Sequence, residues 1–189
     1  MQTKVIETYG IEELEGRAKE NALEWLREGL DYEWYDFVFE DAKKCASILG
    51  IKISDIYFAI DSGACFDGSF SYAKGWKKAL KAYAPIDKEL FSIGQLLQEI
   101  QKPFLYKIEG EVSCDDRYFR TYTGDATING RFADVPDHVM DDLSKPFSDL
   151  AGWIYRNLEK EWDYLISEEQ LIETAKSTAY MFDSEGRII

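Results

Sequence analysis

The stretch IKISDIYFAI at residues 51–60, the turn DSGA at 61–64 and the stretch CFDGSFSY at 65–72 decide the fold class. Apolar side chains recur at every second or third position on both sides of the turn, and β-branched and aromatic residues dominate. Gly63 lies in the turn, where a hairpin needs conformational freedom. The segment therefore predicts two antiparallel strands.

Helical patterns precede this hairpin. Apolar residues three and four positions apart predict one helix over residues 11–28, ending near Gly29, and a second over 31–49, closed by Gly50. Two amphipathic helices in succession must cover an apolar surface, and the predicted hairpin supplies one.

The rest of the chain repeats the alternation of helices and strands. We expect helices over 74–83 and 87–102 and from Asp137 onward, strands over 104–114 and 118–128, and a last helix over 167–179 that begins at Ser167. No linker is long enough to divide the chain. The prediction is a single α+β domain, residues 1–189, with an antiparallel sheet of about four strands covered by amphipathic helices on one face. The outer face is expected to be polar. Trp25, Trp34, Trp153 and Ile154 are expected to share its core.

Charge gives the clearest indication of function. The chain has 36 acidic and 22 basic residues, a formal net charge of −14. Such a chain repels nucleic acid and anionic membranes and attracts basic protein surfaces, so we expect no direct nucleic-acid binding and no membrane binding.

The excess acid is concentrated between Glu12 and Asp41, which span eleven acidic and three basic residues. Glu20, Glu24 and Glu28 recur every four residues, about 6 Å apart along a helix, close to the phosphate spacing of a nucleic-acid strand. A solvated helix face explains the same pattern. Four lysines between 74 and 81 make the chain polarised rather than uniformly anionic. The candidate partner-binding residues are Glu20, Glu24, Glu28, Asp31, Glu33, Tyr35, Asp36 and Glu40.

Motifs for catalysis are weak. His138 is the only histidine, and it fits a solvated helix start better than a general base. Adjacent acids such as Asp141 and Asp142 are expected by chance in so acidic a chain. We therefore predict no enzyme, no catalytic residues, no metal site and no cofactor.

The three cysteines, Cys45, Cys65 and Cys114, are odd in number and widely spaced, which predicts reduced thiols in a cytoplasmic protein. The chain shows no export signal and no stretch of about 18 apolar residues, so membrane insertion is not expected.

Three blocks of sequence carry a resemblance: residues 11–19, residues 30–43 and the run GACFDGSF at 63–70, with the closing segment 182–187. Together they resemble a family of acidic phage and prophage proteins labelled "antitoxin of toxin-antitoxin stability system". The resemblance implies a small accessory protein in a bacterial host cell.

Three functions remain open at this point. The first is a non-enzymatic inhibitor of a basic host protein, such as a defence nuclease complex or a toxin, with nucleic-acid mimicry as one mechanism. The second is an antitoxin for a cognate toxin. The third is a carboxylate-dependent enzyme. The identity of the partner and the oligomeric state do not follow from the sequence.

Overall fold

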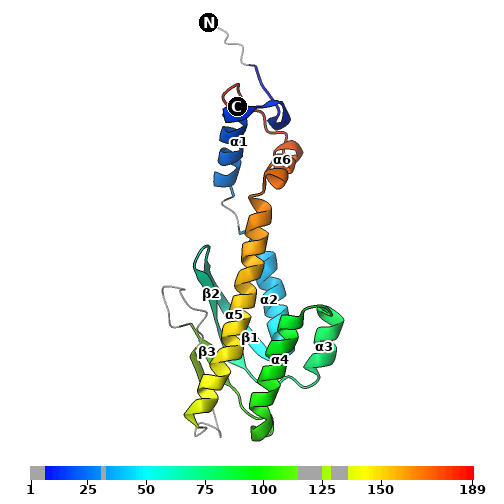
Figure 1. The fold of residues 1–189 in the computed structure, drawn as a ribbon, viewed down its shortest axis with the longest axis vertical. Coiled ribbons are helices and arrows are strands. Elements are labelled where there is room, and N and C mark those ends of the chain that lie inside the picture. Colours follow the sequence, from blue (N-terminus) through cyan, green and yellow to red (C-terminus); the bar gives the residue numbers. More distant parts are fainter. Residues whose placement is uncertain (1–6, 31–32, 115–124, 129–135) are drawn as a thin grey trace. The chain divides into compact units, whose positions relative to one another are not determined.

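The computed structural model describes residues 7–30, 33–114, 125–128 and 136–189. The chain forms two compact units (Figure 1). The smaller unit combines residues 1–34 with 160–189, and the larger one spans Tyr35–Glu159. This division does not test whether the chain folds cooperatively, so the single domain stays a prediction.

The larger unit contains a four-stranded antiparallel sheet in the order β1-β2-β3-β4. The strands are β1 (Ile51–Ala59), β2 (Gly63–Phe70), β3 (Gly110–Ser113) and β4 (Asp125–Ile128). The predicted hairpin is confirmed, and so is the α+β fold class. Of the strand predicted over 118–128, only Asp125–Ile128 lies within the described residues.

The pairing of β1 with β2 contains a β-bulge. Lys52 pairs with Ser69 and Ile53 with Gly68, but the next pair joins Asp55 to Asp67, which leaves Ser54 as an extra residue. A bulge shifts the alternation of side chains by one position. As a result Lys52 and Asp55, three residues apart, project from the same face of the sheet.

Four helices accompany the sheet in this unit: α2 (Asp36–Leu49), α3 (Trp76–Tyr83), α4 (Lys88–Gln101) and the part of α5 (Asp137–Leu165) that ends at Glu159. The sequence predicted each of them within a few residues, apart from the start of α2. Gly50 ends α2 with a φ of 90°, in the left-handed region that favours glycine.

Apolar contacts join these helices to one face of the sheet. The Phe70 ring of β2 lies 5.0 Å from the Phe147 ring of α5, and both side chains are buried. Trp153 of α5 donates a 2.8 Å hydrogen bond to Oδ2 of Asp87, whose other carboxylate oxygen caps the N-terminus of α4. The opposite face carries the polar side chains that the sequence predicted.

One strand boundary differs from the prediction. Residues 104–109 were expected to be extended, but a short 3-10 turn, η2 (Lys102–Phe104), follows α4, and β3 begins only at Gly110. Leu105 and Tyr106 have φ values of 57° and 60°. Pro103 lies in η2 directly after α4, and the left-handed pair that follows turns the chain before it enters the sheet.

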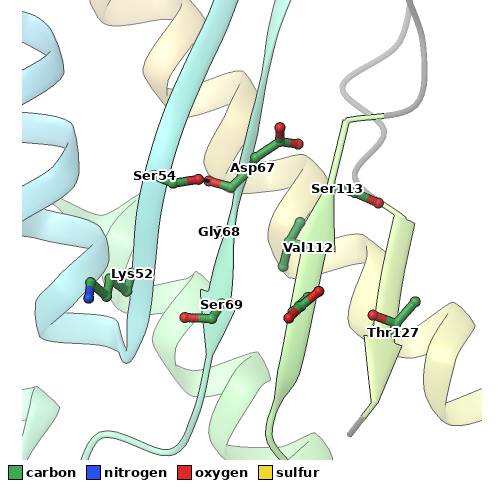
Figure 2. A pocket seen from close by; sticks show the side chains of 9 residues that line it. Lys52, Ser54, Asp67, Gly68, Ser69, Val112, Ser113 and Thr127 are labelled. Atoms are coloured by element: carbon green, nitrogen blue, oxygen red, sulfur yellow. Dashed lines mark hydrogen bonds between the residues drawn. The ribbon is translucent and has the colours of Figure 1, made fainter.

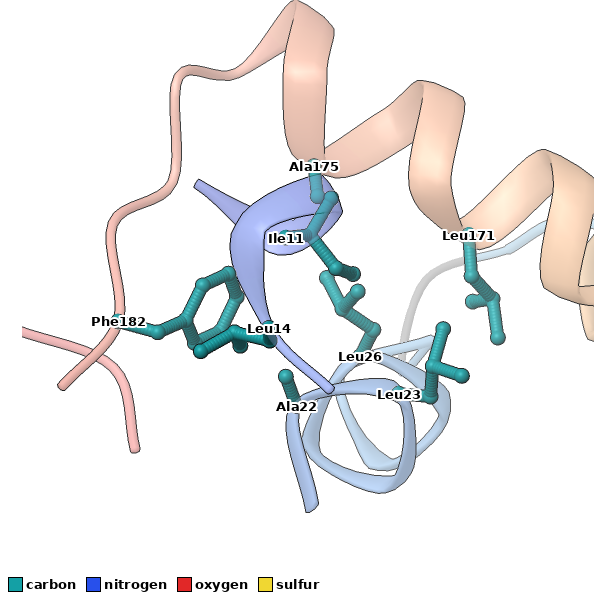
Figure 3. Packing of buried hydrophobic residues seen from close by; sticks show 8 residues of the cluster. All are labelled: Ile11, Leu14, Ala22, Leu23, Leu26, Leu171, Ala175 and Phe182. Atoms are coloured by element: carbon teal, nitrogen blue, oxygen red, sulfur yellow. The ribbon is translucent and has the colours of Figure 1, made fainter. Parts of the chain in front are cut away.

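The smaller unit is helical. It contains η1 (Ile11–Glu13), α1 (Gly16–Glu28) and α6 (Glu168–Ser177). Figure 3 shows its core, in which buried side chains of all three elements pack with Phe182 of the C-terminal segment. Tyr9 and Phe182 also exchange two backbone hydrogen bonds, of 2.8 and 2.9 Å, which pair the N-terminal segment with the C-terminal one.

Two predictions about this unit were wrong. The helix expected over 11–28 is broken at Leu14 and Glu15, because Leu14 is extended and turns its side chain into the core. The four residues expected to form one core fall in both units: Trp25 and Trp34 in the smaller, Trp153 and Ile154 in the larger. Trp25 instead packs edge-on against Tyr180 and Phe182.

The prediction of three reduced thiols was also wrong. Cys65 of β2 and Cys114, just after β3, form a disulfide across a sequence separation of 49 residues, and only Cys45 is free. Sequence spacing could not reveal this pair, because its partners are brought together by the pairing of β2 with β3. The argument from cysteine usage to a cytoplasmic location therefore fails.

None of the helices in the described part of the chain has both the length and the hydrophobicity needed to cross a membrane.

Candidate functional site

The outer face of α1 carries the predicted row of glutamates. Glu20, Glu24 and Glu28 are all exposed, while Ala22, Leu23 and Leu26 face the core of the smaller unit. Spacing of four residues places the three carboxylates on one side of the helix, about 6 Å apart along its axis. Among the described residues none of them forms an ion pair. Their charges are therefore free to act on a partner.

Two lysines of this unit form ion pairs with residues outside the row. Lys19 pairs with Glu168 at 2.7 Å, and Lys176 pairs with Glu12 at 2.8 Å. The hydrogen bond from Lys19 lowers the pKa of the Glu168 carboxyl below its ordinary value. These exposed pairs join α6 to α1 and η1, so the two ammonium groups do not neutralise the glutamate row.

The remaining candidates surround the start of α2. Glu33 is exposed, Asp36 occupies the first turn of α2, where the helix dipole favours a carboxylate, and Glu40 is exposed one turn later. Asp31 lies outside the described residues. Tyr35 is half-buried: its ring lies 4.8 Å from Phe39 and 5.2 Å from Phe58 of β1.

The candidate partner-binding residues are divided between the two units. The glutamate row and Glu33 belong to the smaller unit, whereas Tyr35, Asp36 and Glu40 belong to the larger one. Phe37, next to Asp36 and one turn before Glu40 on α2, is 83% exposed. An exposed aromatic ring among carboxylates is typical of a protein contact.

A polar cluster on α2 went unnoticed in the sequence. Asp41 accepts a 2.6 Å hydrogen bond from the Tyr83 hydroxyl, and Lys44 lies 4.4 Å from the centre of the Tyr83 ring. The hydrogen bond to Asp41 raises the pKa of Tyr83 to about 12. Burial, with Asp41 nearby, raises the pKa of Cys45 to about 12, so this thiol stays protonated at neutral pH and is no nucleophile.

The polar face of the sheet forms a shallow groove of about 610 Å³ (Figure 2). It is lined by side chains from all four strands, with α5 behind the sheet: Lys52, Ser54, Asp67, Ser69, Glu111, Ser113 and Thr127. A second hollow of about 360 Å³ shares Lys52, Ser69 and Glu111 with it. The sequence predicted a polar outer face but not these residues as a group, because the grouping depends on strand register.

Three of the residues weighed for catalysis line one hollow. His138 is exposed near the start of α5, in a hollow that also includes Asp141 and Asp142. Within the described ranges no three histidine, cysteine or acidic side chains are placed to hold a metal ion. Of the four lysines between residues 74 and 81, Lys77 donates a hydrogen bond to the Gln95 side chain of α4.

Comparison with known proteins gives one match. The family described as "Domain of unknown function (DUF8835)" matches residues 34–168, more than half of the chain. No curated protein matches, and no solved structure matches. The matched range contains the whole sheet and helices α2 to α5, and it excludes α1 with its glutamate row. The chain belongs to the DUF8835 family, whose function is unknown.

Proposed function

We propose that this chain is a non-enzymatic, acidic accessory protein of a phage or prophage. It binds and inhibits a bacterial protein that has a basic, nucleic-acid-binding surface. The observation that carries the proposal is the row of Glu20, Glu24 and Glu28, exposed on one side of α1 with no ion pair among the described residues. A basic groove that attracts phosphates would attract this row by the same Coulomb force.

The spacing of the row supports mimicry of a nucleic-acid backbone. Two helical turns separate Glu20 from Glu28, about 12 Å along the axis, a length that holds several phosphates of one strand. The net charge of −14 adds a long-range field that speeds encounter with a cationic partner. In this proposal Asp36 and Glu40 of α2 add contacts around the exposed Phe37 ring.

The proposal includes a cytoplasmic location in a bacterial host. Thiol reductants in that compartment act on disulfides that they can reach, but Cys65 is buried, and neither cysteine of the pair lies on α1, which carries the row. Binding should therefore persist with and without a reductant.

The test uses charge reversal. Immobilised full-length chain is incubated with the heparin-binding protein fraction of a bacterial lysate at about 50 mM salt, where electrostatic attraction is strong. We expect the wild type to retain basic proteins and the variant Glu20→Lys/Glu24→Lys/Glu28→Lys to retain far less. Lysine and glutamate have similar helix propensity, so α1 should persist in the variant.

A matched control separates the row from total charge. The variant Glu15→Lys/Glu159→Lys/Glu173→Lys changes net charge by the same amount at exposed positions on separate elements. It should retain the same proteins as the wild type. Equal loss in both variants would mean that only net charge matters, and unchanged retention in both would end the proposal.

A further inference from the structure

A continuous polar row crosses the sheet on the face opposite the described helices. Lys52 of β1 pairs with Ser69 of β2, Ser69 with Glu111 of β3, and Glu111 with Thr127 of β4. Residues directly opposite one another project from the same face, so these exposed side chains form one line across four strands. Neighbouring strands lie about 4.8 Å apart, which places Lys52 and Glu111 roughly 10 Å from each other.

Next to this row two carboxylates oppose each other. The bulge at Ser54 pairs Asp55 with Asp67, and like charges in directly opposite positions destabilise a sheet. Asp67 is held in place: its Oδ1 accepts a 2.7 Å bond from the Cys114 amide, and its Oδ2 accepts a 3.1 Å bond from the Tyr57 hydroxyl. Asp55 is exposed and has no ion-pair partner within the described residues. The register thus places two carboxylates in opposite positions, and only Asp67 has hydrogen-bond donors among the described contacts.

Small residues make this face hollow. Ser54, Gly68, Ser69 and Ser113 are small residues that line the groove next to the longer Lys52 side chain (Figure 2). A Cβ at Gly68 would collide with the Lys52 carbonyl oxygen, so the bulge itself requires glycine there. The groove has room for an extended peptide or a long side chain lying on the strands.

The charges on this face are complementary to a cation. Three carboxylates, Asp67, Glu109 and Glu111, line these hollows together with one ammonium group, Lys52. Asp55 lies beside them, because it is paired with Asp67. A guanidinium or ammonium group beside Asp55 and Asp67 would relieve their repulsion, and serine hydroxyls on the floor can accept its remaining hydrogen bonds. Among the described residues that line the two hollows, Lys52 is the one side chain with a charge that attracts an anionic ligand.

We propose that this sheet face, within the region that defines the family, binds an arginine- or lysine-bearing segment of the basic partner protein. The inference rests on the proposed function and adds a second contact surface to it. Its residues lie inside the range 34–168 matched by the family, whereas the α1 row lies outside that range. Other members of the family can therefore share the sheet surface without the row.

The test measures binding of a fluorescein-labelled eight-residue peptide of alternating arginine and serine by anisotropy, at about 150 mM salt. A peptide of the same length with citrulline in place of arginine keeps the side-chain shape and removes the charge. A peptide with glutamate in place of arginine reverses the charge. The variant Asp55→Asn/Glu111→Gln should raise Kd for the arginine peptide by more than twofold and by up to about thirtyfold, the range expected for two exposed charge pairs. The citrulline and glutamate peptides should bind far more weakly than the arginine peptide.

The control variant Asp142→Asn/Glu159→Gln removes the same charge from exposed positions on α5. It should leave Kd within about twofold of the wild type. Amide chemical shifts should move on β1, β2 and β3 when the arginine peptide is added. As an independent sign of the relieved repulsion, Asp55→Asn alone should raise Tm.

The outcomes separate this inference from the proposed function. Equal effects of the two double variants, shifts confined to other elements, or preference for the glutamate peptide would overturn the sheet surface. If the α1 reversal abolishes capture of basic proteins while the sheet variants change nothing, the proposed function stands and this inference fails. If neither set of variants has an effect, both fail.

Discussion

Removal of the Cys65–Cys114 disulfide gives the most quantitative test of the fold. The bond closes a loop with a sequence separation of 49 residues that contains α3, α4 and β3. A cross-link of this length reduces the entropy of the unfolded chain enough to stabilise the folded state by about 4 kcal/mol. We expect the variant Cys65→Ala/Cys114→Ala to lose that amount, since β2 and β3 then hold together through only three residue pairs.

The assay is urea unfolding followed by tryptophan fluorescence, in the presence and absence of a phosphine reductant. The free energy of unfolding falls by about 2 kcal/mol per molar urea. Reduction of the wild-type disulfide should therefore lower the urea concentration at the unfolding midpoint by roughly 2 M. The double variant should show the lower midpoint under both conditions. Thiol labelling provides the covalent check: the unfolded, unreduced wild type should expose one thiol, Cys45, and the reduced chain all three.

Three labelled thiols in the unreduced, unfolded protein would refute the disulfide itself. One labelled thiol with an unchanged midpoint under reduction would refute the energetic argument, because it would mean that β2 and β3 need no cross-link.

Three further predictions concern the larger unit. Replacing buried Trp153 with Ala should lower the free energy of unfolding by about 3–5 kcal/mol, because it leaves a cavity. Replacing it with Phe should lower that free energy by about 1–3 kcal/mol, because Asp87 loses the indole N–H donor. Urea unfolding measures both losses. Gly94→Ala should cost about 1–3 kcal/mol in the same assay, since the new methyl group would lie 2.5 Å from the buried Trp76 ring. The raised pKa of Cys45 means that the folded state holds the thiol proton more tightly than the unfolded state does. Its contribution to stability is therefore complete below the ordinary pKa of 9.0 and declines as pH rises toward 12. Tm measured from pH 8 to pH 11 should fall less steeply in Cys45→Ala than in the wild type.

Much of the fold follows from local sequence signals. The turn at residues 61–64 and the alternation around it predicted β1 and β2, and glycine or serine caps predicted the ends of α2 and the start of α6. Ser167 accepts a hydrogen bond from the Gln170 amide, as the capping pattern requires. Turn and capping patterns of this kind involve residues that are close together in the chain, so they can be read from the sequence alone.

The features that sequence reasoning missed depend on contacts between distant residues. Leu14 breaks the first predicted helix because its side chain belongs to a core that includes Phe182, far along the chain. Leu105 and Tyr106 adopt left-handed backbone angles that no local sequence motif predicts. The pairing of Cys65 with Cys114 follows from strand order, which the spacing of cysteines does not encode.

The candidate site shows the same division. The spacing of Glu20, Glu24 and Glu28 was enough to place them together on one helix face. The sheet surface needed the register, because the bulge at Ser54 decides that Asp55 faces Asp67. A shift of one residue would reverse the direction of Asp55, and the sequence alone does not fix that shift.

Competition with duplex DNA tests the central claim most directly. The chain is proposed to occupy the nucleic-acid-binding surface of a basic protein, so DNA and the chain must exclude each other on that partner. Basic proteins retained on the immobilised wild type at about 50 mM salt should be released by excess duplex DNA and by a rise to about 300 mM salt. Retention that persists in excess DNA and at the higher salt would contradict the claim.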